Sequence, residues 1–251
     1  MERLRLVKLS YYYFPTSHWS RMVSLCIAEK GLSPERHFVD ITTNANFAAE
    51  YLRINPRGVV PTLVHNGETI CGTERICRYL ANFDGPQIQG GDAAAGWADR
   101  LSAVRMMHVS YRTWIDQGGH SGSRLADKVS RASQYALDYP DLRDHYERKR
   151  AFFENFIAEI DDPIYMSGVY EAVRNLLATL AEVVADQPFI DGESWSKADA
   201  AATPVLYRLR DLGLLDGLAG DAQPALASYL ERQMERPSFA AVFVEDPFLN
   251  R

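Results

Sequence analysis

Residues 54–64 read Ile54-Asn55-Pro56-Arg57-Gly58-Val59-Val60-Pro61-Thr62-Leu63-Val64, and this stretch is the most informative part of the sequence. An apolar strand runs into Pro61 and continues beyond it, although proline removes a donor from a sheet and is normally excluded from central strands. A sharp turn before the strand, most simply a cis peptide, accommodates the proline. Such a turn leaves the backbone N–H and C=O of Val60 free to pair with an extended, peptide-like ligand. An edge strand that tolerates proline is the alternative.

Strand and helix patterns alternate around this stretch. Upstream, periodicity predicts a strand over residues 4–9, a helix over 20–30, a second strand over 37–41 and a second helix over 45–53. Downstream, Asn66-Gly67 between two β-prone runs is a strong hairpin signal, and Thr73 follows as the N-cap of another helix. The order βαβαββα predicts an α/β domain with a mixed four-stranded sheet.

A segment rich in glycine and small residues divides the chain. Residues 85–97 have this composition and predict a linker. Beyond it, apolar residues recur at helical spacing almost to the end of the chain, and Ser196-Lys197-Ala198-Asp199 forms a capping box that starts a helix. We therefore expect a first domain over 1–84 and an all-helical second domain over 98–251.

Composition argues against several classes of function. The net charge of −6 and the pI near 5.6 argue against nucleic acid as a partner. No apolar run approaches the ~20 residues that span a bilayer, and the N-terminus has no signal-peptide core, so no membrane partner is expected. The three cysteines form no CxxC pair and the six histidines lack ligand spacing. We expect a cytoplasmic protein with reduced cysteines and no metal site.

Four motifs resemble those of the cytosolic glutathione S-transferase family. They are Ser17-His18-Trp19-Ser20-Arg21-Met22-Val23, Asn55-Pro56-Arg57-Gly58-Val59-Val60-Pro61-Thr62-Leu63, Ile76-Cys77-Arg78-Tyr79-Leu80 and Phe189-Ile190-Asp191-Gly192-Glu193-Ser194-Trp195-Ser196-Lys197-Ala198-Asp199-Ala200. Together they span nearly the whole chain in the family's order. The resemblance implies a thioredoxin-like first domain, a helical second domain, glutathione as co-substrate and a homodimer. It points to the serine-type, theta- or zeta-like branch.

In this family, the enzyme stabilises the glutathione thiolate, because the thiolate and not the thiol is the nucleophile. A hydroxyl that donates to the sulfur at a helix N-terminus lowers the thiol pKa. The resemblance places Ser17 at the catalytic serine and Tyr13 at the tyrosine of other classes. Ser17 is the favoured donor, and Tyr13, Ser20 and a water-mediated arrangement are alternatives, although Ser20 is also the expected helix N-cap. Trp19 stands where some members carry a cysteine, which argues against a mechanism needing a protein thiol there.

The same resemblance supplies the remaining contacts to glutathione. Besides Ser17, the residues expected to bind glutathione are Trp19, Val59, Val60, Pro61, Gly72 and Thr73. Most members hold the γ-glutamyl group with an acidic residue followed by serine, but these positions are Gly72 and Thr73 here, and Glu74 lies two residues too late. Thr73 can still bind the carboxylate at a helix N-terminus. Either another acid, for instance from the dimer mate, binds the ammonium group, or glutathione binds weakly.

The second domain is expected to line the pocket for the electrophile. The candidate pocket residues on the helix after the linker are Met107, His108, Tyr111 and Trp114. The same helical spacing also suits a helix that packs in the core. The sequence leaves both interpretations open.

Residues 117–162 are longer than the corresponding region of the commonest family members. They contain a glycine-rich loop over 118–123 and a turn over 139–144 that opens a long charged helix. Bacterial family members of aromatic catabolism, the tetrachlorohydroquinone reductive dehalogenases and the β-aryl-ether-cleaving enzymes, have a similar expansion. An extra solvated helical hairpin is the alternative. Arg124, Lys128 and Arg131 would steer an anionic substrate or form a solvated face.

These observations predict a glutathione S-transferase that joins the glutathione thiolate to a small electrophile, expected to be aromatic or xenobiotic. The first alternative is a glutathione-dependent reductive dehalogenase, ether lyase or isomerase on the same fold. The second is a non-catalytic interaction module that keeps the fold and has lost the thiol chemistry. Gly72 favours this last alternative, whereas Ser17 and the Val60-Pro61 pair argue against it.

Overall fold

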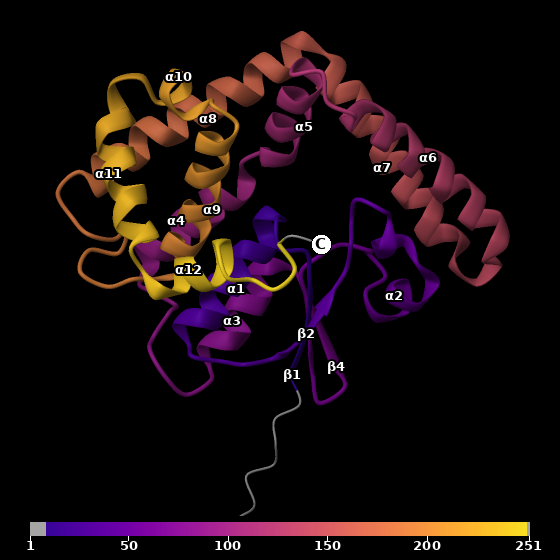
Figure 1. The fold of residues 1–251 in the computed structure, drawn as a ribbon, viewed down its shortest axis with the longest axis horizontal. Coiled ribbons are helices and arrows are strands. Elements are labelled where there is room, and N and C mark those ends of the chain that lie inside the picture. Colours follow the sequence, from indigo (N-terminus) through magenta and orange to yellow (C-terminus); the bar gives the residue numbers. More distant parts are fainter. Residues whose placement is uncertain (1–8, 250–251) are drawn as a thin grey trace, which may run out of the picture.

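The structure is a computed structural model that describes residues 9–249. A small sheet with its helices forms one part of the molecule, and a larger helical part lies beside and above it (Figure 1). The first part contains β1 (Leu9–Tyr13), α1 (His18–Glu29), β2 (Glu35–Phe38), α2 (Ala49–Ile54), β3 (Thr62–His65), β4 (Glu68–Cys71) and α3 (Thr73–Ala81). The helical part contains α4 (Asp92–Ala103), α5 (Met106–Asp116), α6 (Ser121–Asp138), α7 (Arg143–Asp161), α8 (Pro163–Val184), α9 (Lys197–Asp211), α10 (Leu215–Ala219), α11 (Gln223–Met234) and α12 (Pro237–Phe243).

The four strands form one mixed sheet in the order β2-β1-β3-β4. β1 pairs with β2 in parallel, whereas β3 is antiparallel to both β1 and β4. Asn66 and Gly67 connect β3 to β4 with φ angles of 50° and 89°, which is the left-handed conformation that an Asn-Gly hairpin favours. The predicted α/β fold with a four-stranded mixed sheet, followed by helices, is confirmed.

The two faces of the sheet pack differently. Tyr11 and Tyr13 are fully buried in the large core that includes α1 and α3, because alternate residues of a strand point to one face. Tyr12 points to the other face and packs in a smaller cluster with Tyr51 of α2 and Val60. The α2 side of the sheet is therefore the side on which the Val60-Pro61 stretch is supported.

Helix α9 organises the helical part, as its capping box predicts. The Ser196 side chain accepts a hydrogen bond from the backbone at the start of α9, and the Asp199 carboxylate accepts one from the Ser196 N–H at 2.8 Å. Asp199 is fully buried, as are Ala200, Val205 and Leu209 along the same helix. No helix in residues 9–249 combines the length and the hydropathy needed to cross a membrane.

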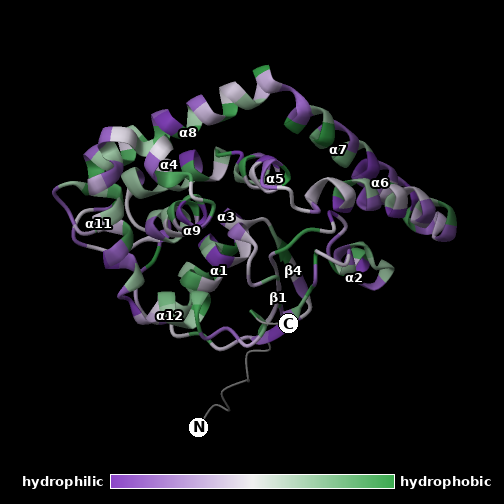
Figure 2. Ribbon diagram, turned by 45° about the horizontal axis from the view of Figure 1, so that its top comes forward, coloured by the Kyte–Doolittle hydropathy of each residue, from purple (hydrophilic) through white to green (hydrophobic). Residues whose placement is uncertain are grey.

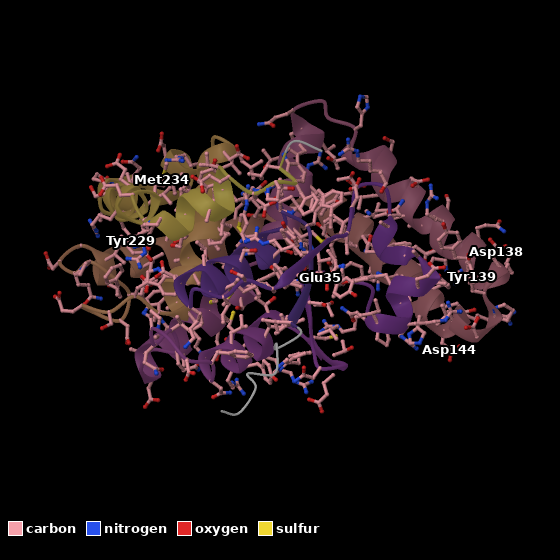
Figure 3. The ribbon with its side chains drawn as sticks, turned by 60° about the horizontal axis from the view of Figure 1, so that its bottom comes forward. Glu35, Asp138, Tyr139, Asp144, Tyr229 and Met234 are labelled. Atoms are coloured by element: carbon pink, nitrogen blue, oxygen red, sulfur yellow. The ribbon has the colours of Figure 1, made fainter. Side chains whose placement is uncertain are left out.

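Helices α6 and α7 form an antiparallel hairpin that projects from the helical part toward α2 (Figure 1). Asp138, Tyr139 and Asp144 lie together at the far end of this hairpin (Figure 3). Hydrophilic and hydrophobic residues alternate along both helices (Figure 2), so the hairpin has one face packed against protein and one face in water. Residues 117–162 thus contain the helical hairpin that the sequence left as an alternative, and its first helix begins at Ser121, inside the segment predicted as a glycine-rich loop over 118–123.

Some predicted boundaries are wrong. Helix α1 begins at His18 rather than at residue 20, because Ser17 and not Ser20 is its N-cap. The second strand ends at Phe38, before most of its predicted range of 37–41. Helix α4 begins at Asp92, inside the segment predicted as a linker. The predicted strand over 4–9 lies, except for Leu9, outside the described residues.

Candidate functional site

Strand register brings three predicted site segments to one end of the sheet. Tyr12 of β1 pairs with Thr62 of β3, and Thr62 pairs with Cys71 of β4. The end of β1, the start of β3 and the end of β4 therefore lie side by side. The chain reaches Ser17 shortly after β1, passes Val60 shortly before β3, and enters α3 directly after β4.

Ser17 caps the first turn of α1. Its hydroxyl oxygen accepts a hydrogen bond from the Ser20 N–H at 3.4 Å, and its own N–H donates to the Phe14 carbonyl at 2.9 Å. A hydroxyl has one hydrogen to donate and two lone pairs, and the cap uses only a lone pair. The first turn of α1 contains no acidic residue, so the positive end of the helix dipole is not neutralised there. This position can donate to an anion and stabilise it.

Two buried arginines fix the turn that carries Ser17. Arg21 Nε donates to the Pro15 carbonyl at 3.0 Å, and Arg208 Nη2 of α9 donates to the Thr16 carbonyl at 2.7 Å. Neither guanidinium makes an ion pair with any residue in 9–249. Burial lowers the pKa of Arg21 to about 10, so this group is still charged at neutral pH. Asp211 acts on both charges and Asp246 on that of Arg21, but neither carboxylate forms an ion pair with them, so two positive charges lie on the turn that carries Ser17.

His18, the residue after Ser17, adds no charge of its own. Burial, and less strongly the positive charge of Arg208, lower the pKa of His18 to about 3. The imidazole is therefore neutral at neutral pH and packs edge-on against the Trp19 ring, with 4.6 Å between centroids. Trp19 itself is half-buried against the core.

The Val59–Val60 peptide is held in one orientation from behind. The Val59 carbonyl accepts from the Tyr51 hydroxyl at 2.7 Å and from the Asn55 side-chain amide at 2.8 Å. In a trans peptide the N–H points opposite to the C=O, so the Val60 N–H faces away from these groups. The Val60–Pro61 bond is cis, and no hydrogen bond within residues 9–249 uses the backbone N–H or C=O of Val60. An unpaired backbone edge is available here for an extended ligand.

Gly58, just before this peptide, is required by its surroundings. Its φ is +54°, and a Cβ there would lie 2.3 Å from Lys149 Cε and 2.8 Å from the Asn46 carbonyl oxygen. We expect Gly58→Ala to destabilise the protein by about 1–3 kcal/mol, measured by urea unfolding. Gly213→Ala is the control, because Gly213 also has a positive φ but no atom within 4 Å of the added Cβ. Equal losses in the two variants would contradict a role for packing at Gly58.

The backbone explains why glycine stands at position 72. Gly72 has φ 94° and ψ 124°, a conformation open essentially to glycine, so an acidic residue would be strained there even though space is available. Thr73 is the first residue of α3 and Gly72 is its N-cap, so the prediction of Thr73 as the N-cap is wrong. Glu74 is already paired, since Lys197 Nζ of α9 donates to its carboxylate at 2.7 Å. Thr73, at the N-terminus of α3, is thus the polar side chain nearest in sequence to the expected γ-glutamyl position.

Tyr13 has a partner of its own. Its hydroxyl donates to both carboxylate oxygens of Asp246, at 3.0 and 2.7 Å, and Arg36 also binds this carboxylate at 3.0 Å. Burial is the main cause that raises the pKa of Tyr13 far above its ordinary value. In this arrangement the Tyr13 hydroxyl is occupied in the contact between β1 and the C-terminal segment.

The four pocket candidates on α5 point in different directions. Trp114 lies under the Arg208 guanidinium, with 5.3 Å from its carbon to the ring centroid, and Tyr111 packs edge-on against Trp114. His108 instead points into the helical part, where its Nε2 lies 2.7 Å from Glu159 of α7. Met107 is partly exposed. Trp114, with Tyr111 behind it, is therefore the candidate connected to the Ser17 turn.

Comparison with protein families accounts for both parts of the chain. Residues 16–82 match the family model described as glutathione S-transferase, N-terminal domain, and residues 68–232 match that described as glutathione S-transferase, C-terminal domain. The chain belongs to the glutathione S-transferase family. The predicted family is therefore confirmed.

Individual relatives of this chain are moderately similar to it. The chain is 28% identical over 245 residues to the tetrachloro-p-hydroquinone reductive dehalogenase of Sphingobium chlorophenolicum, covering 92% of this chain and 94% of the relative. The crystal structure of β-etherase LigF from Sphingobium sp. strain SYK-6 superposes with a TM-score of 0.71 at 22% identity, covering 95% and 99% of the two chains. A glutathione transferase homologue from Sulfitobacter with bound glutathione gives a TM-score of 0.62 at 21% identity, covering 94% and 97%.

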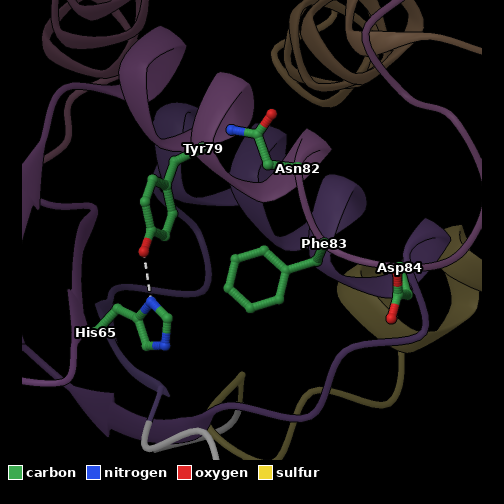
Figure 4. A pocket seen from close by; sticks show the side chains of 5 residues that line it. All are labelled: His65, Tyr79, Asn82, Phe83 and Asp84. Carbon is green, nitrogen blue, oxygen red and sulfur yellow. Dashed lines mark hydrogen bonds between the residues drawn. The ribbon is translucent and has the colours of Figure 1, made fainter.

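A separate hollow of about 340 Å³ lies at the opposite end of the sheet. It is lined by His65, Tyr79, Asn82, Phe83 and Asp84, with the Tyr79 hydroxyl turned toward His65 (Figure 4). His65 is at the end of β3 remote from Val60, where it pairs with Leu9. This hollow is not part of the site around Ser17.

Several residues around the site carry no recognisable sequence signal. Arg208 lies on α9, nearly 200 residues from the turn it binds, and the sequence interpretation of α9 was purely structural. Asn55 and Tyr51 support the Val59 carbonyl, and only the short spacing of Asn55 before Pro61 could have indicated this. Lys128, predicted to steer an anionic substrate or to lie on a solvated face, is instead 5% exposed.

Proposed function

We propose that this protein is a glutathione-dependent enzyme that directs the glutathione thiolate to an electrophilic carbon of a small, aromatic or xenobiotic substrate. The observation that carries the proposal is the free hydrogen of the Ser17 hydroxyl at the start of α1, at the same end of the sheet as the unpaired edge of Val60. Glutathione would lie extended along Val60, with its γ-glutamyl carboxylate at Thr73. We assign the thiolate contact to Ser17 rather than Tyr13, whose hydroxyl binds Asp246.

Three features would favour ionisation of the thiol. The Ser17 O–H would donate to the sulfur, which is a charge-assisted hydrogen bond once the thiolate forms. The positive end of α1 and the two arginines, Arg21 and Arg208, would stabilise the same negative charge. A thiol titrates near 8.5 in water, so a modest fall in its pKa gives mostly thiolate at neutral pH.

The electrophile would bind between the Ser17 turn and α5. Trp114 and Tyr111 offer aromatic surface there, and Arg208 lies against the face of Trp114. The sulfur would attack the electrophilic carbon, and the leaving group would depart with the bonding electron pair. Met107 is retained as a candidate at the edge of this pocket, whereas the Glu159 partner of His108 argues for a structural role.

A glutathione-dependent dehalogenase or ether-cleaving enzyme is the second candidate, favoured by the names of the two Sphingobium relatives. Trp19 leaves no protein thiol at the start of α1, and Cys26 and Cys77 are buried between α1 and α3. The third cysteine, Cys71, is half-buried at the end of β4, so a reductive reaction would draw its second thiol either from another glutathione, releasing glutathione disulfide, or from Cys71, forming a mixed disulfide. Product analysis separates the candidates, since reductive dehalogenation releases a disulfide, whereas ether cleavage yields a thioether together with a released alcohol or phenol.

The remaining expectations belong to the same proposal. The family resemblance implies a homodimer in the cytoplasm, and the dimer mate is a source for the acidic group that Gly72 does not supply. We keep the division into a glutathione-binding domain over 1–84 and a helical substrate-binding domain, which begins with α4 at Asp92 rather than at residue 98.

Glutathione binding is the direct test. We expect millimolar glutathione to raise the melting temperature, because a ligand that binds only the folded state stabilises it. Free glutamate and free cysteine at the same concentration serve as controls and should give no comparable shift. An unchanged melting temperature at millimolar glutathione would contradict both enzymatic candidates and favour a non-catalytic module.

A further inference from the structure

The α6–α7 hairpin binds the segment that leads to Val60. Residues 41–58 connect β2 to the Val59–Val60 peptide and contain α2. In Figure 1, α2 lies next to α6 and α7. The Tyr146 hydroxyl of α7 donates to the Phe47 carbonyl in this segment at 2.8 Å. The hairpin is thus in direct contact with the glutathione-binding part of the molecule.

Lys128 of α6 anchors the first half of this segment. Its Nζ donates to the Ile41 carbonyl and to Asn44 Oδ1, both at 2.7 Å, and is 5% exposed. Asn44, which has a left-handed backbone, donates in turn to Asp127 of α6 at 2.7 Å. Two side chains of α6 therefore fix the turn after β2.

Lys149 of α7 anchors the second half. Its Nζ donates to the Gly58 carbonyl at 2.8 Å and lies 4.4 Å from the centroid of the Phe47 ring, and the residue is 8% exposed. The absence of a Cβ at Gly58 is what allows this approach. The next carbonyl along the chain, that of Val59, is the one held by Tyr51 and Asn55. The hairpin thus fixes the Gly58 carbonyl, whereas Tyr51 and Asn55 fix the Val59 carbonyl.

We infer that the α6–α7 hairpin is a positioning element for glutathione, acting through Lys149 and Lys128 on the 41–58 segment and hence on the Val59–Val60 peptide. The inference rests on the proposed glutathione site. A peptide edge that is already ordered loses less conformational entropy when the ligand binds. The inserted hairpin would therefore increase affinity for glutathione without touching it.

Because of the charges around Lys149, an effect of this residue on glutathione binding can be separated from an effect on the stability of the fold. Within residues 9–249 its ammonium has no carboxylate partner, and the charged group that faces it is Lys128. Burial, and then the charge of Lys128, lower the pKa of Lys149 to about 7. A lysine whose pKa is lowered on folding destabilises the fold most below that pKa, and the effect disappears as the pH rises toward the ordinary lysine value. Asn46 also donates to the Gly58 carbonyl, so that oxygen keeps a partner when Lys149 is removed.

The test compares Lys149→Met with the parent protein at pH 6, using calorimetric titration with glutathione and thermal melting. We expect the dissociation constant for glutathione to rise about three- to tenfold, the usual effect of losing one hydrogen bond, while the melting temperature stays equal or rises. Lys128→Met should weaken binding in the same direction. Arg150→Met, at an exposed position on α7, is the matched control and should change neither quantity.

The outcomes separate the inference from the proposed function. If the parent protein binds no glutathione, the proposed function is wrong. If the parent binds and both lysine variants bind within about twofold of it, the hairpin is not a positioning element. Weaker binding that appears only together with a lower melting temperature also contradicts the inference, because it indicates a purely structural role.

Discussion

Replacing Ser17 by alanine is expected to lower kcat for the glutathione-dependent reaction by about 100- to 1,000-fold, the effect of removing one donor from a developing anion. The alanine variant also loses the cap of α1, which costs about 0.5–2 kcal/mol of stability. The cap bond is long, at 3.4 Å, so the loss should be at the lower end of that range. Initial rates and melting temperature, measured on the same preparation, distinguish the two effects.

Two variants at Ser17 separate the hydroxyl from the cap. Ser17→Thr keeps both and should retain most of the activity, whereas Ser17→Asp keeps a capping oxygen but, when ionised, has no hydrogen to donate, and should be stable and nearly inactive. Tyr13→Phe should keep kcat, because the Tyr13 hydroxyl binds Asp246. An active Ser17→Ala protein together with an inactive Tyr13→Phe protein would show that our assignment of the donor is wrong.

Replacing Asp199 by alanine is expected to destabilise the protein by about 3–5 kcal/mol. One carboxylate oxygen accepts from the Ile190 N–H at 2.9 Å and the Tyr229 hydroxyl at 2.7 Å, and the other from the Ser196 N–H at 2.8 Å. Asp199 is fully buried, so these donors would be left in the interior without partners. A shift of the urea midpoint measures the loss.

The control for this variant is Asp186→Ala, at an exposed position, which should change stability by less than about 0.5 kcal/mol. If Asp199→Ala lost no more than that control, the capping box would not be the organising feature of the helical part. Tyr229→Phe measures the contribution of one hydrogen bond, because that variant removes only one of the donors to the Asp199 carboxylate.

Local chemistry explains what could be predicted from the sequence. The hairpin at Asn66-Gly67 and the capping box at Ser196 and Asp199 depend on residues that are neighbours in the chain, and both are confirmed. The end of β1, the start of β3 and the end of β4 meet because the strand order brings them together, and the sequence predicted the succession of the elements and a mixed sheet but not this spatial order. Boundaries were less certain, since Ser17 and Ser20 are both good caps and the sequence alone does not choose between them.

Contacts between distant segments could not be predicted. Arg208 reaches the Thr16 carbonyl from α9, and Lys149 reaches the Gly58 carbonyl from the inserted hairpin. A charged residue on a helix is usually solvated, and the local sequence around a buried arginine or lysine does not differ from that around a solvated one. The sequence therefore did not indicate that Arg208 and Lys149 are buried. Gly72 shows the reverse case, in which a departure from the family pattern has a local reason: its backbone lies in a region that an acidic residue would enter only with strain.

The ionisation of bound glutathione tests the central claim most directly. Ultraviolet difference absorbance of the thiolate, recorded against pH with saturating glutathione, gives the pKa of the bound thiol. We predict a pKa clearly below the ~8.5 of a free thiol in the parent protein, and a return toward that value in Ser17→Ala. A bound thiol that titrates like free glutathione, or a low pKa that Ser17→Ala leaves unchanged, would contradict the account.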